Sequence, residues 1–213
     1  MTIVVWDGKT LAADRMTSNG SAGSLKSHRT SETTKIILFP NKPRFGDKGQ
    51  HLLAAAYSGT VSMFSTFHDI VFKGMDDPVN ADVDYYGRVQ IAKDMQLAAP
   101  SMSALYLVSD DKGKTHADVL TWANPDGSPA RRGRFFKAGR LATIGSGSVP
   151  CRVFFSRMKG VDSIQLVHLA TKYAPGCGLG IDYFQPGWDE LKRIKELGVE
   201  DKVKIAQLFA DTL

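Results

Sequence analysis

The sequence is poor in cysteine, and it lacks long apolar runs. Two cysteines among 213 residues, Cys151 and Cys177, are too few for a secreted scaffold held by disulfides, so we read both as reduced thiols. No stretch approaches the ~18 consecutive apolar residues of a membrane span. The N-terminus also lacks the basic and apolar regions of a signal peptide. These absences favour a cytoplasmic protein that does not contact a membrane.

Patterns that would indicate a metal or a nucleotide are missing as well. The five histidines are scattered without the spacing of zinc ligands, and we read them as structural (28, 51, 68, 116 and 168). Segment 143–148, TIGSGS, is followed by Val149 and Pro150, where the dinucleotide motif needs further glycine, and it lacks the P-loop lysine. The sequence therefore argues against zinc chemistry and against nucleotide binding.

Positive charge is in modest excess, with a net charge of +5 and a pI near 9.2. The basic residues concentrate in segment 130–140, ARRGRFFKAGR, which reads either as a nucleic-acid patch or as a hairpin arm with a solvated basic face. No zinc-finger, P-loop or RNA-binding signature accompanies it. We favour the hairpin arm and expect no nucleic-acid partner.

The chain length fits one domain over residues 1–213, with a core at 2–182 and a C-terminal helical tail at 187–213. Strand-like composition recurs at 2–6, 9–13, 35–39, 51–57, 103–109, 115–122, 134–144 and 177–184. Helical spacing occurs at 60–74, 83–99, 149–159, 161–174, 188–198 and 200–213. Residues 15–34 form a long polar connection between strands.

Runs of strands followed by runs of helices indicate an α+β protein with antiparallel sheets. Two antiparallel sheets packed face to face, with helices outside both, accommodate this inventory. We therefore expect a four-layer αββα sandwich.

The first strand begins almost at the chain terminus, at Thr2. If Met1 is removed, Thr2 carries both a free amine and a hydroxyl, and the amine can act as the base that activates the hydroxyl. The Asp7-Gly8 pair predicts a two-residue hairpin turn, which would bring Asp14 back beside Thr2. Taken alone, Thr2 also reads as a routine strand residue and Asp14 as a turn residue.

Two further positions carry chemistry of the same kind. Lys35 heads the strand after the long connection, and a lysine near an amine and a hydroxyl lowers their pKa values. The Gly-Ser elbow around Ser146 brings backbone amides and a hydroxyl to the start of a helix. Lys35 alone also reads as a surface lysine.

Five short segments resemble, in order, those of proteasome-type peptidases: MTIVV, AAD, TTKI, YSGT and ATIGSGS (1–5, 12–14, 33–36, 57–60 and 142–148). The chain resembles a proteasome β-type subunit of the N-terminal-nucleophile (Ntn) hydrolase superfamily over residues 2–182. It is closest in outline to bacterial HslV-like homologues, because no propeptide precedes the threonine.

The resemblance implies a threonine-type endopeptidase. Thr2, exposed by loss of Met1, would attack the scissile carbonyl through its hydroxyl. Lys35 would lower the pKa of that hydroxyl, and Asp14 would hold Lys35 in its charged state. The family often carries an Asp and a Ser before its last core strand, where Tyr173 and Gly176 stand here.

The resemblance also implies a role for three other residues and for partners. Ser146 would hydrogen-bond around the new α-amine, and a backbone N–H at Ser58 or Gly59 would form the oxyanion hole. No metal or organic cofactor takes part. Substrates would be unfolded polypeptides or peptides, cleaved inside a homo-oligomeric ring or double ring, and an ATP-dependent unfoldase partner is left open.

Two other functions remain compatible with the sequence. One is a non-catalytic ring or scaffold subunit that kept the fold. The other is a small-molecule amidase of the same superfamily.

Overall fold

A computed structural model describes residues 2–19, 29–46, 49–59, 102–123, 129–174 and 176–210. The chain divides into two compact units: Met1–Ile36 with Arg140–Leu213, and Ile37–Gly139. No helix among the described residues is long and apolar enough to cross a membrane. The helices predicted at 60–74 and 83–99 fall outside the described residues.

The first unit is built on a five-stranded antiparallel sheet in the order β10-β1-β2-β11-β12, counted over the residues described. Its strands are β1 (Val4–Trp6), β2 (Leu11–Asp14), β10 (Ala142–Ile144), β11 (Ile181–Phe184) and β12 (Lys192–Ile194). In β1 and β2, every residue is buried. The β1–β2 hairpin thus lies between two segments that are distant in sequence, β10 beside β1 and β11 beside β2.

The β1–β2 hairpin confirms the predicted antiparallel return, but its loop is longer than the predicted two-residue turn. Trp6 pairs with Leu11, so four residues, Asp7 to Thr10, connect the strands. The reason lies in the Asp7 carboxylate, whose Oδ1 accepts the backbone N–H groups of Lys9 and Thr10, each at 2.8 Å. This aspartate-stabilised turn replaces the tighter one.

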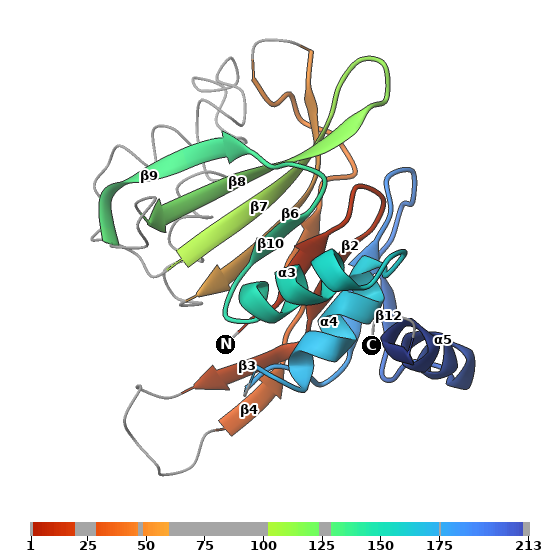
Figure 1. Ribbon diagram of the computed structural model, residues 1–213. Coiled ribbons are helices and arrows are strands. Elements are labelled where there is room, and N and C mark those ends of the chain that lie inside the picture. Colours follow the sequence, from red (N-terminus) through yellow and green to blue (C-terminus); the bar gives the residue numbers. More distant parts are fainter. Residues whose placement is uncertain are drawn as a thin grey trace. The chain divides into compact units, whose positions relative to one another are not determined.

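Three helices belong to the first unit: α3 (Ser148–Arg157), α4 (Ser163–Thr171) and α5 (Val199–Ala210). The helices predicted at 149–159, 161–174 and 200–213 are thereby confirmed, with slightly different ends. Figure 1 shows α3 and α4 side by side, and α4 packs on β1 and β2. Buried apolar residues of both helices and of β1, β2 and β11 form one core cluster.

Helix α4 begins where its sequence dictates. The Asp162 side chain accepts the N–H of Gln165, and the Gln165 side chain accepts the N–H of Asp162, which completes a capping box. Such a reciprocal pair satisfies two backbone donors that the first helical turn leaves unbonded. The helix start is therefore encoded locally.

The long polar connection predicted at residues 15–34 contains two strands that the sequence pattern did not indicate. These are β3 (Met16–Asn19) and β4 (Arg29–Glu32), which pair as a two-stranded antiparallel ribbon. The composition of this segment is rich in Ser and Thr and poor in apolar anchors. Sequence patterning missed the ribbon because patterning detects an apolar face, whereas a ribbon of polar residues is defined by its backbone ladder.

The helix predicted at 188–198 is wrong, because this segment contains strand β12. Backbone pairing with β11 sets Asp182 opposite Arg193, and Arg193 Nε donates to Asp182 Oδ1 at 2.9 Å. Lys192 Nζ also lies 4.1 Å from the centre of the Trp188 ring. The backbone pairing and the ion pair with β11, an existing sheet edge, outweigh the local helical spacing.

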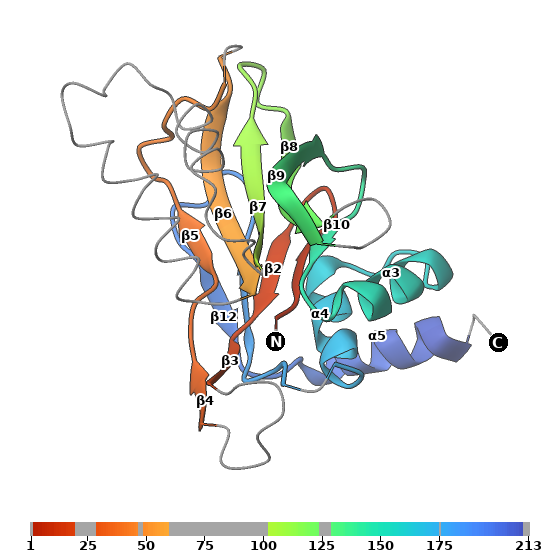
Figure 2. The same cartoon turned by 90° about the vertical axis from the view of Figure 1, so that its left-hand side faces the viewer.

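The second unit carries a second five-stranded sheet, in the order β5-β6-β7-β8-β9 among the described residues, which Figure 2 shows from one side. Its strands are β5 (Ile36–Leu38), β6 (His51–Gly59), β7 (Met102–Ser109), β8 (Thr115–Ala123) and β9 (Pro129–Lys137). Strands β6 to β9 pair antiparallel. Most of the basic segment 130–140 thus forms β9, which pairs with β8 as the predicted hairpin arm.

The α+β class and the two antiparallel sheets predicted from the sequence are confirmed. The two antiparallel sheets and the helices described above agree with an Ntn-like fold. The stacking of four layers stays a prediction.

Candidate functional site

Thr2 lies two residues before β1, directly against the Gly-Ser elbow that joins β10 to α3. Its backbone nitrogen donates to Ser146 Oγ at 3.2 Å. Its carbonyl oxygen accepts the Gly147 N–H at 3.3 Å and Ser146 Oγ at 3.4 Å. Thr2 is buried, with 6% of its surface exposed. Ser146 Oγ thus lies beside the Thr2 nitrogen, and its role toward a free α-amine stays a prediction.

Asp14 and Lys35 form a buried ion pair beside the start of β1. Lys35 Nζ donates to Asp14 Oδ1 at 2.7 Å, and both side chains are almost fully buried. The same carboxylate oxygen accepts the Ile3 backbone N–H at 2.7 Å. A single oxygen atom therefore joins the lysine to the strand that carries Thr2.

The second carboxylate oxygen of Asp14 is also bonded. Asp14 Oδ2 accepts the backbone N–H of Gly178 at 3.1 Å and that of Met16 at 3.3 Å. Lys35 Nζ makes a further bond to the Met16 carbonyl oxygen at 2.7 Å. A buried charge bonded on all sides is fixed in position, because any rotation would leave a buried polar atom without a partner.

The electrostatics of Lys35 are set by two opposing effects. Burial lowers the pKa of the Lys35 ammonium below its ordinary value, and the neighbouring Asp14 carboxylate counteracts part of that shift. Burial prevails because water no longer solvates the charged form. The neutral amine of Lys35 is therefore less unfavourable, relative to the ammonium, than that of a surface lysine.

Cys177 belongs to this site, although the sequence pattern gave it no role. Its sulfur lies 3.7 Å from Ser146 Oγ, and 9% of its surface is exposed. Burial raises the pKa of the Cys177 thiol, and the Asp14 carboxylate adds to the shift. In the sequence, Cys177 stood out only by its place in the glycine-rich stretch APGCGLG. In the structure, the next residue, Gly178, donates its N–H to Asp14.

Tyr173 and Gly176 stand at the two positions where the family often carries Asp and Ser. Tyr173 is 62% exposed, with its ring 5.4 Å from that of Phe154. Gly176 turns the backbone with a φ of 78°. The segment before β11 therefore reaches the buried pair through Cys177 and Gly178.

The predicted oxyanion residues belong to the second unit. Ser58 and Gly59 end β6, Ser58 is buried, and Gly59 has a φ of 108°. Their role stays a prediction. In the part of the chain that the structure describes, no group of three His, Cys, Asp or Glu side chains is placed to hold a metal ion.

Comparison with known proteins first defines the fold. No protein-family model matches the sequence, and no curated protein matches it. Solved structures do match, over nearly the whole chain and at identities that show the fold alone.

Among these solved structures are several Anbu proteins. The Gly-1 mutant of Anbu from Hyphomicrobium sp. strain MC1 has a TM-score of 0.65 at 14% identity, over 99% of this chain and 94% of that one. Anbu (ancestral beta-subunit) from Yersinia bercovieri has 0.61 at 12%, over 99% and 97%. The helical assembly of the Anbu complex from Pseudomonas aeruginosa has 0.61 at 9%, over 99% and 93%.

These structures correct the resemblance inferred from sequence. The prediction of an HslV-like proteasome β-type subunit is wrong, because the structural neighbours are Anbu proteins. The described residues of the five short segments lie at the beginnings or ends of strands and at the helix elbow. Such positions are constrained by the shared fold, so they do not separate one branch of similarly folded proteins from another.

Proposed function

We propose that this chain is a threonine-type endopeptidase that uses Thr2 as its nucleophile after Met1 is removed. The observation that carries the proposal is the Asp14 carboxylate, whose Oδ1 binds both Lys35 Nζ and the Ile3 N–H at 2.7 Å. This one atom fixes a buried ammonium group next to the residue that follows Thr2. A purely structural strand end does not require a buried lysine, whose desolvation is costly.

In the proposed reaction, Thr2 Oγ1 forms a bond to the carbonyl carbon of the peptide. Its proton passes to the new α-amine, whose pKa of about 7.7–8.0 in peptides suits a general base near neutral pH. Collapse of the tetrahedral intermediate breaks the C–N bond, and the proton goes to the leaving amine. Water then hydrolyses the ester and restores Thr2.

The remaining residues of the site position this chemistry. Ser146 Oγ, 3.2 Å from the Thr2 nitrogen, orients the amine and relays its proton. The Lys35 ammonium favours the alkoxide that develops on Thr2. Backbone N–H groups at Ser58 or Gly59 would bind the oxyanion, which requires the two sheets to stack in the predicted four-layer arrangement.

We further propose that the protein works in the cytoplasm as an assembly of identical chains, each one folding as a single domain. The helical assembly of the Anbu complex from Pseudomonas aeruginosa supports self-association. A closed ring and a helix use the same kind of head-to-tail interface and differ in whether the rotation closes. Enclosure would limit substrates to unfolded polypeptides or peptides that can thread in, and an unfoldase would be the partner that supplies them.

The test combines a mass measurement with covalent labelling. We expect the N-terminal peptide of the purified protein to lack Met1. We also expect a peptide electrophile that reacts with both an α-amine and a hydroxyl to label the protein at Thr2. Thr2→Ala and Lys35→Ala should abolish labelling. Thr143→Ala removes another buried threonine of the same sheet and should label normally.

Two outcomes would contradict the peptidase. Retention of Met1 leaves Thr2 without a free amine, and equal labelling of all variants places the reaction elsewhere. Loss of Met1 without any labelling would instead favour the scaffold subunit. Hydrolysis of short amides but not of peptides would favour the amidase.

A further inference from the structure

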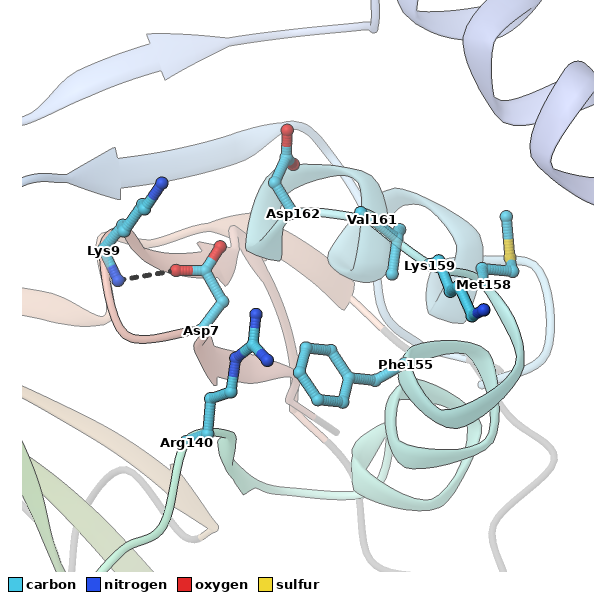
Figure 3. A pocket seen from close by; sticks show the side chains of 9 residues that line it. Asp7, Lys9, Arg140, Phe155, Met158, Lys159, Val161 and Asp162 are labelled. Atoms are coloured by element: carbon cyan, nitrogen blue, oxygen red, sulfur yellow. Dashed lines mark hydrogen bonds between the residues drawn. The ribbon is translucent and has the colours of Figure 1, made fainter.

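A cavity lies in the first unit, and none of the residues that line it belongs to the proposed peptidase site. Its volume is about 430 Å³, within the range of small-molecule sites. Its lining comes from three parts of the chain. These are the β1–β2 loop, Arg140 just before β10, and the segment from the end of α3 to Asp162 before α4. Figure 3 shows its side chains.

Three cationic side chains line this cavity: Lys9, Arg140 and Lys159. All three residues are exposed. Among the residues that the structure describes, none of these three side chains has a hydrogen bond or an ion pair. In Figure 3, Arg140 reaches between Asp7 and Phe155, with Lys9 and Lys159 on opposite sides. Two carboxylates, Asp7 and Asp162, line the same cavity, so three positive and two negative side chains leave it a formal charge of +1, which favours an anion.

The two carboxylates of the cavity offset part of this positive charge, and backbone N–H groups fix their positions. Asp7 accepts three backbone N–H groups, two within its own loop and that of Ser163 at 2.8 Å. Asp162 accepts the Gln165 N–H at 2.8 Å. The same bonds occupy N–H groups in the first turn of α4, so the side chains must recognise a ligand.

The cavity also has an apolar part. Met158 and Val161 are buried, with 2% and 5% of their surfaces exposed, and Phe155 is half-buried. A guanidinium group binds a carboxylate or a phosphate through two parallel hydrogen bonds. An aromatic face beside it gives an apolar group of the same ligand a surface to contact.

We propose that this cavity binds a small organic oxyanion, a carboxylate or phosphate that carries an apolar group. Arg140 and Lys159 hold the oxyanion, Lys9 adds to the positive field, and Phe155 contacts the apolar group. The proposal does not depend on peptidase activity, since none of these residues belongs to the Thr2 site.

The test is a titration of the full chain with phenyl phosphate, phenylacetate, inorganic phosphate and benzylamine, followed by calorimetry. We expect saturable binding of at least one aromatic anion, weaker binding of inorganic phosphate, and none of benzylamine. The tighter of the two aromatic anions identifies the oxyanion. Arg140→Gln and Lys159→Gln should each weaken binding about tenfold. Circular dichroism confirms that both exposed variants fold.

Lys112→Gln is the matched control, because it removes one exposed positive charge in the other unit, and it should bind like the unchanged protein. An equal loss of binding in Lys112→Gln would show that only net charge matters. Binding of benzylamine as tight as that of the anions would reduce the cavity to an apolar surface. Absence of saturation by either aromatic anion up to about 10 mM would also overturn the proposal.

Discussion

At the scale of single residues, the buried pair of Asp14 and Lys35 dominates the chemistry of the first unit. Removing two charges from water is costly, and their attraction offsets that cost only when the remaining lone pairs and protons are bonded. Here three backbone N–H groups bind the carboxylate, and the Met16 carbonyl binds the ammonium. The polar atoms of both side chains are therefore hydrogen-bonded, and loss of either residue would leave the other charge buried without its partner.

This dependence of each buried charge on its partner predicts the result of a double-mutant cycle. Lys35→Met and Asp14→Asn should each lower the free energy of unfolding by about 3–5 kcal/mol, because each leaves a buried charge uncompensated. The double variant should cost about 1–3 kcal/mol less than their sum. Urea denaturation measures all three. Lys172→Met, at an exposed position, should change stability by less than about 0.5 kcal/mol, and strict additivity would show that the pair is not coupled.

The pH dependence of the same site has a definite sign. Burial lowers the pKa of Lys35 below its ordinary value of 10.5. Between the folded and unfolded pKa values, the unfolded chain binds the proton that the folded chain has lost. The contribution of Lys35 to stability therefore rises with pH through this window, and it is least favourable below the folded pKa.

Cys151 predicts a second residue-scale result. Burial raises the pKa of its thiol to about 12, so on the order of 10⁻⁴ of it is thiolate at pH 8. Iodoacetamide should therefore alkylate Cys151 at least about a hundredfold more slowly in the folded protein than in urea. Peptide mass mapping over time measures both rates. Equal rates would mean that the thiol is accessible and ionises normally.

At the scale of elements, the elbow between β10 and α3 controls the position of the first strand. A Cβ atom added at Gly147 would lie 2.1 Å from Cγ1 of Ile3, the buried residue next to Thr2. Only glycine allows the helix start to approach β1 this closely. The elbow thus fixes the strand end as well as the Ser146 hydroxyl.

Gly147→Ala should consequently lower stability by about 1–3 kcal/mol through overpacking, and it should reduce labelling of Thr2 because Ile3 must move. Gly139→Ala is the matched control, since nothing lies within 4 Å of an added Cβ there. Thermal unfolding and the labelling assay measure the two effects. A Gly147→Ala protein as stable and as readily labelled as Gly139→Ala would show that the contact is not restrictive.

At the scale of the whole molecule, the proposed self-association leads to a prediction about assembly. The purified protein should sediment at a mass several times its chain mass of 23.3 kDa. Electron microscopy would then separate a closed ring from a helix by whether the interface rotation closes. A species of 23.3 kDa at every concentration tested would contradict self-association.

The sequence by itself determined the features that are encoded locally. Turn and capping residues such as Asp7 and Asp162 stand next to the backbone groups that they bond, so the hairpin and the start of α4 were predictable. Apolar patterning likewise indicated most strands and the α+β class. The sequence also singled out Thr2 by its place near the chain terminus and Lys35 by its place at the head of a strand. Asp14 was predicted to lie near Thr2 because the hairpin returns it there.

Only the tertiary structure decided the features that depend on a distant partner. Segment 188–198 became strand β12 because β11 offered an edge, and the polar ribbon β3–β4 formed through backbone pairing that side-chain patterns do not report. Cys177 and Gly178 reached the buried pair from the far end of the chain. Local composition measures the preference of a segment in isolation, whereas pairing and burial depend on which other segment lies beside it.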